Sequence, residues 1–161
     1  MKDLEANIQY KNDMKDQFTI GSLSISTIPL NHPGGGLGYK FMEDGKSFVF
    51  LTDNELGYQH PGGQEAVIYE HFCKDADLVF HDAEFTPGEY PSKIGWGHSA
   101  YTDVIDLAIK ARVKKLGLFH INQERTDIQM DKIVDHCRQI IQHKGGGMVC
   151  IGVACNMTFT L

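Results

Sequence analysis

Residues 43–53 read EDGKSFVFLTD, and this stretch decides the fold. Residues 43–46 combine acidic side chains with a glycine, as a tight turn does, and the continuous apolar run over 47–51 predicts a buried strand. Asp53 follows that strand almost directly. The stretch therefore predicts a strand that leaves a turn, crosses the core and delivers a carboxylate at the edge of a sheet.

The flanking sequence alternates between the two kinds of element. Further strands are expected over 23–27, 37–42, 77–80, 115–120, 148–153 and 157–161. Apolar residues at helical spacing predict helices over 64–74, 101–112 and 126–144. In the first helix Val67, Ile68 and Phe72 would face inward, and Ser99 would cap the second. This order predicts a mixed α/β (α+β) fold, a layered sheet with helices on one face.

Length and composition indicate one globular domain. The chain has 161 residues, 42% of them hydrophobic and 22% charged, with a mean hydropathy of −0.27. Its apolar runs are far shorter than the roughly 20 residues that cross a bilayer. We expect a polar lead-in over residues 1–17, a domain over 18–161, no membrane association and, because residues 1–16 lack an apolar signal region, a cytoplasmic location.

Cysteines and charge exclude some classes of site. The four cysteines show no C-x-x-C spacing, so we expect reduced, buried thiols and no zinc knuckle. The net charge of −6 gives no strong field for a nucleic-acid backbone. If RNA is a substrate, a local patch must bind it.

Three polar residues stand at predicted strand ends. His32 follows the apolar residues 28–30, Asp53 follows the strand over 47–51, and His120 ends the strand over 115–120. Imidazole and carboxylate ligands together suit zinc, manganese or iron, so these residues are candidate metal ligands if they meet at one sheet edge. Taken singly, each is weak evidence, because a histidine at a strand end is more often a capping or solvated residue.

A second group could transfer protons. Asp82 follows a short buried strand. His98 lies between Gly97 and Ser99, in a loop that also contains Gly95. A carboxylate that fixes the tautomer of an imidazole makes that imidazole a general acid. The alternative for Asp82 is a helix or turn cap. Trp96 beside His98 could line a substrate pocket or pack against its loop.

Five motifs in order resemble a known family. They are LNHPGGGLGYK (30–40), LTDNE (51–55), HDAEF (81–85), GWGHS (95–99) and LFH (118–120). The chain from residue 18 onward resembles the C-terminal half of metallo-β-lactamase superfamily hydrolases, in the branch of ribonuclease Z and cyclic-nucleotide phosphodiesterases. The resemblance implies half of an αββα sandwich, with a second sheet face to face with this one.

The resemblance also implies roles. His32 would bind a first metal ion, Asp53 would bridge two, His120 would bind the second, and Asp82 and His98 would form a proton-transfer pair. Two divalent ions would then activate a water molecule that attacks a small phosphodiester or RNA. The ions would be zinc or manganese, with iron as the alternative. The substrate and the metal stay open, because one fold serves many reactions.

Two departures limit this expectation. Residues 120–123 read HINQ, where many relatives have His-His-Asp-Pro, and the His-x-His-x-Asp-His motif of the family does not occur in these 161 residues. We therefore expect weak or no metal binding and no activity from this chain alone, with the missing N-terminal half as its partner. The alternative is a non-catalytic half-domain that dimerises or binds a partner through an exposed apolar sheet face.

Overall fold

A computed structural model describes residues 16–161, so the predicted lead-in over 1–17 lies almost wholly outside the described residues. Within this part, seven strands form a single sheet in chain order: β1 (Gln17–Ile20), β2 (Leu23–Pro29), β3 (Leu37–Glu43), β4 (Lys46–Leu51), β5 (Leu78–Asp82), β6 (Lys115–Phe119) and β7 (Val149–Gly152). The helices are α1 (Ala66–Cys73), α2 (Tyr101–Lys110) and α3 (Asp127–His143), with a short 3-10 turn over Tyr90–Ser92. The predicted mixed sheet is confirmed.

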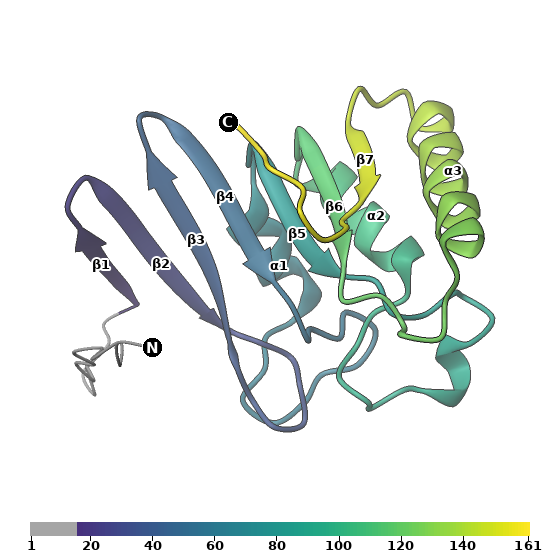
Figure 1. Ribbon diagram of the computed structural model, residues 1–161. Helices are drawn as coiled ribbons and strands as arrows, with labels where there is room; N and C mark the ends of the chain where they lie inside the picture. Colours follow the sequence, from purple (N-terminus) through teal and green to yellow (C-terminus); the bar gives the residue numbers. More distant parts are fainter. Residues whose placement is uncertain (1–15) are drawn as a thin grey trace, which may run out of the picture.

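Strand direction brings several loops to one edge. Strands β1 to β4 pair antiparallel and strands β4 to β7 pair parallel. Strands β2, β4, β5 and β6 therefore run the same way, and their carboxyl ends all lie along the lower edge of the sheet in Figure 1. In an open sheet this edge is the usual place for a site.

The turn that begins β4 has the predicted chemistry. Asp44 and Gly45 both have positive φ, 49° and 74°, as the central residues of a type I′ hairpin turn require. The turn sets the register in which Glu43 pairs with Lys46 and Phe41 with Phe48. In that register Val49 and Leu51 lie on the opposite face of β4 from Phe48 and are fully buried.

The helices cover one face of the sheet, as predicted (Figure 1). The core between the two layers contains Val49 and Leu51 of β4, Val104 and Ala108 of α2, and their buried neighbours. Burying a Val or Leu side chain contributes roughly 1.5–3 kcal/mol, so this layer is the main source of stability. Helix α3 begins with a capping box formed by Thr126 and Gln129, which satisfies two backbone N–H groups.

Two local predictions about helices were wrong. In α1 the buried residues are Tyr69 and Cys73, whereas Val67 and Ile68 are exposed. Tyr69 turns inward because its hydroxyl donates to the Pro29 carbonyl oxygen at 2.9 Å, which anchors that face of the helix. Ser99 does not cap α2, because its hydroxyl donates to the Asn54 carbonyl oxygen at 2.6 Å and Ala100 holds the N-cap position.

The face of the sheet opposite the helices carries aromatic rings. Phe48, Phe50, Phe80 and Phe119 form neighbouring pairs with ring centroids 5.1 to 6.2 Å apart, and all four remain partly exposed. We call these four residues the aromatic face. Nothing on the described part of the chain covers them with a second layer except the C-terminal segment.

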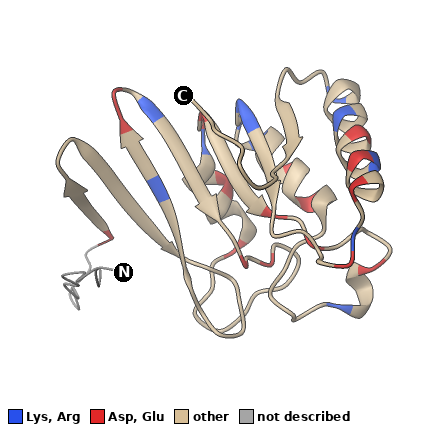
Figure 2. Ribbon diagram, in the orientation of Figure 1, with Lys and Arg blue, Asp and Glu red and all other residues tan. Residues whose placement is uncertain are grey.

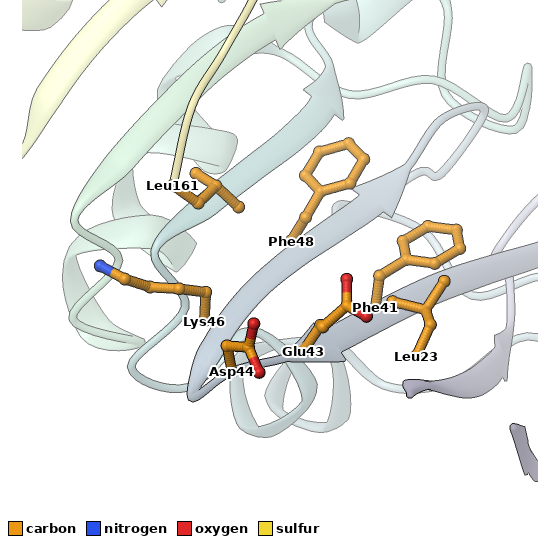
Figure 3. A pocket seen from close by; sticks show the side chains of 7 residues that line it. All are labelled: Leu23, Phe41, Glu43, Asp44, Lys46, Phe48 and Leu161. Carbon is orange, nitrogen blue, oxygen red and sulfur yellow. The ribbon is translucent and has the colours of Figure 1, made fainter. Parts of the chain in front are cut away.

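That C-terminal segment is not the strand predicted over 157–161. It crosses the aromatic face without strand pairing, with Phe159 against Phe80 at 5.2 Å between centroids. Leu161 lies over Phe48 in a cavity of about 280 Å³ at the turn end of β4 (Figure 3). The C-terminal segment is therefore held by side-chain contacts with these rings and not by backbone hydrogen bonds to a neighbouring strand.

Three of the cysteines, Cys73, Cys137 and Cys150, are buried and free as expected, but Cys155 is exposed. Among the described residues, no helix combines the length and apolar character that crossing a bilayer demands.

Candidate metal centre

Asp53 and His120 follow two parallel strands, β4 and β6, that lie on either side of β5. Asp53 comes two residues after β4 and His120 directly after β6. Both have left-handed backbones, with φ of 57° and 45°. Such conformations cost a non-glycine residue about 1 kcal/mol and gather at functional sites, and Asp and His tolerate them better than most residues.

These two side chains meet, and His98 joins them. Nε2 of His120 is 3.2 Å from Oδ1 of Asp53. One ligand atom from each of Asp53, His98 and His120 lies within 4.8 Å of the others. The rings of His98 and His120 stack with centroids 4.7 Å apart. Acidic residues recur in the loops at this edge of the sheet (Figure 2).

His98 is held from behind by Asp82. Its Nδ1 is 3.1 Å from Oδ2 of Asp82, which lies at the end of β5 and is fully buried. The same carboxylate accepts the backbone N–H groups of Asn54 at 2.7 Å and Ser99 at 3.1 Å. Asp82 therefore accepts backbone N–H groups from two loops, as a capping residue does, and also orients the imidazole of His98.

The charges of this pair are coupled. Burial alone would raise the pKa of Asp82, but hydrogen bonds from His81, His98 and a backbone amide outweigh it and hold that pKa below its ordinary value. Burial alone would lower the pKa of His98, but the hydrogen bond to Asp82 and the nearby negative charges raise it overall. His98 is thus biased toward the protonated form that a general acid needs.

Glu84 is a site residue that sequence reasoning missed. Its Oε2 atom is 3.5 Å from Nε2 of His98 and 3.7 Å from Nδ1 of His120, so it faces both rings. The signal was available, because Glu84 stands two residues after Asp82 in the same loop.

His32 lies beside this group without joining it. Its loop follows β2 at the same edge, and its ring centroid is 5.6 Å from that of His98, edge to face. Its Nδ1 accepts the backbone N–H of Gly34 at 3.2 Å. The described atoms thus bring together Asp53, His98 and His120, whereas His32 is not among the residues whose ligand atoms lie within 4.8 Å of one another.

A buried carboxylate ties the loops of the site together. Glu55 is fully buried and accepts hydrogen bonds from the Tyr90 hydroxyl and the Gly95 backbone at 2.8 Å, and from the Gly97 backbone at 2.7 Å. Nε2 of His60 is a further 2.8 Å contact. Hydrogen bonds from the Gly95 and Gly97 backbones and from the His60 and Tyr90 side chains outweigh burial and lower its pKa. No spacing in the sequence predicts this cluster, because its members are distant along the chain.

The three-ligand group suits a divalent cation. Two imidazoles and one carboxylate are ligands that zinc and manganese accept. Two ligands of one tetrahedral zinc, each about 2.0–2.1 Å from it, lie about 3.3 Å apart. The 3.2 Å contact between Asp53 and His120 has that spacing. A protonated imidazole cannot bind a metal ion, so with His98 as a proton donor this group supplies two ligands, Asp53 and His120.

Sequence comparison gives relatives for this arrangement. No protein-family model matches the chain. Over 149 residues, 84% of this chain, it is 26% identical to a ribonuclease Z of Exiguobacterium sibiricum. Its fold matches the metallo-β-lactamase fold protein YhfI from Bacillus subtilis over 90% of this chain, with a TM-score of 0.67 and 17% identity. The short form of human tRNase Z matches over 67% of the chain, with a TM-score of 0.55 and 22% identity.

This chain is similar in sequence to ribonuclease Z and has the metallo-β-lactamase fold. The expected fold is therefore confirmed, and so is the resemblance to ribonuclease Z. The chain spans about half the length of these relatives: 49% of the Exiguobacterium ribonuclease Z, 51% of YhfI and 40% of the human tRNase Z.

Proposed function

We propose that this chain forms the C-terminal half of a metal-dependent phosphodiesterase. In it His32, Asp53 and His120 serve as metal ligands, and His98 serves as the general acid with Asp82 behind it. The observation that carries the proposal is the convergence of Asp53, His98 and His120 within 4.8 Å at the carboxyl ends of β4 and β6. Two bound divalent ions would supply Lewis acidity and an activated water.

The residues of the chain divide the remaining work. His98 presents Nε2 to the pocket while Asp82 holds Nδ1 at 3.1 Å, so a proton on Nε2 can pass to a departing oxygen. Glu84 faces both histidines and balances the charge of His98 when that imidazole is protonated. A pocket of about 600 Å³, lined by His98, His120 and the loops around them, has room for one phosphodiester and its neighbouring groups.

The aromatic face supports the second part of the proposal, an N-terminal half that packs on it. Four neighbouring phenylalanines are only partly covered, and soluble monomers rarely leave large contiguous apolar patches open. A second sheet about 10 Å away would bury these rings as the helices bury the other face. The His-x-His-x-Asp-His motif would arrive with that sheet and complete the ligand set.

The same aromatic face favours a second candidate function, a non-catalytic half-domain that dimerises through these rings. Substitution of Phe50 and Phe119 by Asp would then convert a dimer to a monomer, measured by light scattering during gel filtration. A monomeric chain whose aromatic face binds a hydrophobic dye would favour the half-enzyme.

Hydrolysis of bis(p-nitrophenyl) phosphate with added Mn²⁺ or Zn²⁺ tests the proposed activity. We would compare this chain with the same chain extended by whatever coding sequence lies in frame upstream of Met1. The proposal expects turnover from an extended chain that contains His-x-His-x-Asp-His and none from this chain alone. Full activity in this chain alone would contradict the proposal. An in-frame upstream sequence that lacks the motif would also contradict it.

A further inference from the structure

The loop that carries His98 is built around the carboxylate of Glu55. The backbone N–H groups of Gly95 and Gly97 donate to the two oxygens of this carboxylate, at 2.8 and 2.7 Å, and the carboxylate is fully buried. Both glycines have positive φ, 85° and 94°, a conformation that residues with a Cβ rarely adopt. The backbone on the N-terminal side of His98 is therefore shaped to place two donors on one acceptor.

Burial of apolar side chains does not hold this loop. Trp96 lies between the two glycines and is 58% exposed, and Ile94 is 52% exposed. Packing against the loop, one of the two interpretations that the sequence left open for Trp96, does not describe such an exposed ring. A hydrogen bond from a backbone N–H to a carboxylate is roughly twice as strong as one between neutral groups. The contacts with Glu55 are thus the main restraint on the backbone of residues 95–97.

Glu55 is itself anchored from the loop of His32. The N–H of Glu55 donates to the carbonyl oxygen of Asn31 at 2.9 Å, and Nδ2 of Asn31 donates to the carbonyl oxygen of Glu55 at 2.5 Å. Asn31 is buried and directly precedes His32. The Tyr90 hydroxyl and Nε2 of His60 each lie 2.8 Å from the Glu55 carboxylate. Both the backbone and the carboxylate of Glu55 are therefore fixed.

We propose that Glu55 is a positioning residue for His98, which it places through the backbone of residues 95–97 without touching the reacting groups. This role rests on the proposed function, in which His98 donates the proton. Asp82 orients the imidazole from Nδ1 at 3.1 Å, whereas Glu55 determines where the backbone of His98 stands. A displacement of about 1 Å at a catalytic group can cost roughly 10²-fold in rate, so a residue that fixes this loop controls turnover.

Proton NMR of the 161-residue chain in EDTA tests this role without turnover. In the parent chain the amide protons of Gly95 and Gly97 should exchange slowly with solvent, although neither residue belongs to a helix or strand. A downfield signal should mark the proton between Nδ1 of His98 and Asp82. Exchange of both glycine amides as fast as in an unstructured peptide would overturn the role, and this measurement needs no variant.

Glu55→Gln tests the role directly, because glutamine has one acceptor oxygen and at least one glycine amide then loses its partner. We expect that amide of Gly95 or Gly97 to exchange about tenfold faster relative to the amide of Val79, a fully buried residue of β5 that reports global unfolding. The downfield signal of His98 should disappear. Exchange that accelerates only in step with Val79, together with an unchanged His98 signal, would overturn the role.

Tyr90→Phe is the matched control, because it removes one hydrogen bond from the same carboxylate and leaves both glycine acceptors in place. It should lower the melting temperature and leave the relative exchange rates and the His98 signal at their parent values. Loss of the His98 signal in this variant as well would overturn the role, since any destabilisation would then displace the imidazole. Because these measurements use neither metal nor substrate, such a result leaves the hydrolysis test untouched, and failure of that test leaves these signals unchanged.

Discussion

The Nδ1 atom of His98 lies 3.1 Å from Oδ2 of Asp82, while the same carboxylate accepts the backbone N–H groups of Asn54 and Ser99. One buried acid therefore fixes the loop that follows β4, the loop that precedes α2 and the imidazole between them. The relationship makes the ionisation of His98 depend on Asp82, and that dependence is measurable.

Asp82→Asn should lower the pKa of His98. Burial of the imidazole would then act without the hydrogen bond and charge that now outweigh it. In the parent chain the pKa of His98 is above 6.5, so its contribution to stability is complete below pH 6.5 and is lost as the pH rises through the folded value. Titration of the histidine ring signals by NMR measures both variants. An identical midpoint for His98 in each would show that Asp82 does not control the imidazole.

Glu55→Gln should cost about 2–4 kcal/mol of the free energy of unfolding at pH 7, because a buried carboxylate with four hydrogen-bonding partners loses its charge. Urea unfolding followed by circular dichroism gives the value. Glu65→Gln, at an exposed carboxylate before α1, is the matched control and should change stability by less than about 0.5 kcal/mol.

The same carboxylate predicts a pH dependence. Because the pKa of Glu55 is below its ordinary 4.5 in the folded chain, its contribution is fully present above pH 4.5 and is lost as the pH falls through the lower folded value. The difference in stability between the parent and Glu55→Gln should therefore shrink below pH 4.5. A constant difference down to pH 3 would mean that the charge is not what holds the loop.

Alanine substitutions at Gly95 and Gly97 distinguish the cost of backbone strain from the cost of steric overlap. Both have positive φ, but an added Cβ on Gly95 has no heavy atom within 4 Å, whereas one on Gly97 meets His32 and Pro33. Gly95→Ala should therefore cost about 1 kcal/mol, from the backbone alone, and Gly97→Ala should cost at least 1–2 kcal/mol more. Thermal unfolding measures the pair. Equal losses of stability in the two variants would mean that the loop of His32 moves away from the added Cβ at no cost.

The sequence predicted the layers of this fold better than it predicted contacts between distant loops. The period of the hydrophobic residues and the turn residues predicted β2 to β7 and the three helices. The predicted strand ends placed Asp53 and His120 at one edge of the sheet. The inward face of α1 was wrong, because the hydrogen bond from Tyr69 to Pro29 joins residues 40 positions apart. The strand expected over 157–161 was wrong because Phe159 packs on Phe80 instead of pairing its backbone.

The candidate site shows the same division. The end of each strand is encoded locally by hydrophobic period and turn residues, so the sequence anticipates which residues reach the edge. The partners of Glu55 and the position of Glu84 between two histidines depend on loop conformations that no periodicity encodes. His32 reaches the same edge and its ring is 5.6 Å from that of His98, but it does not join the group formed by Asp53, His98 and His120.

Calorimetric titration of the 161-residue chain with Zn²⁺ at pH 7 tests the central claim, that Asp53 and His120 belong to one cation site. Asn is the substitution of choice at both positions, because it tolerates the left-handed backbone that each residue adopts. We predict weak binding of zinc by the parent chain, loss of that heat in Asp53→Asn and in His120→Asn, and no change in His71→Asn on exposed α1. Identical curves for the parent and both site variants, or two zinc ions held tightly by all of them, would contradict the account.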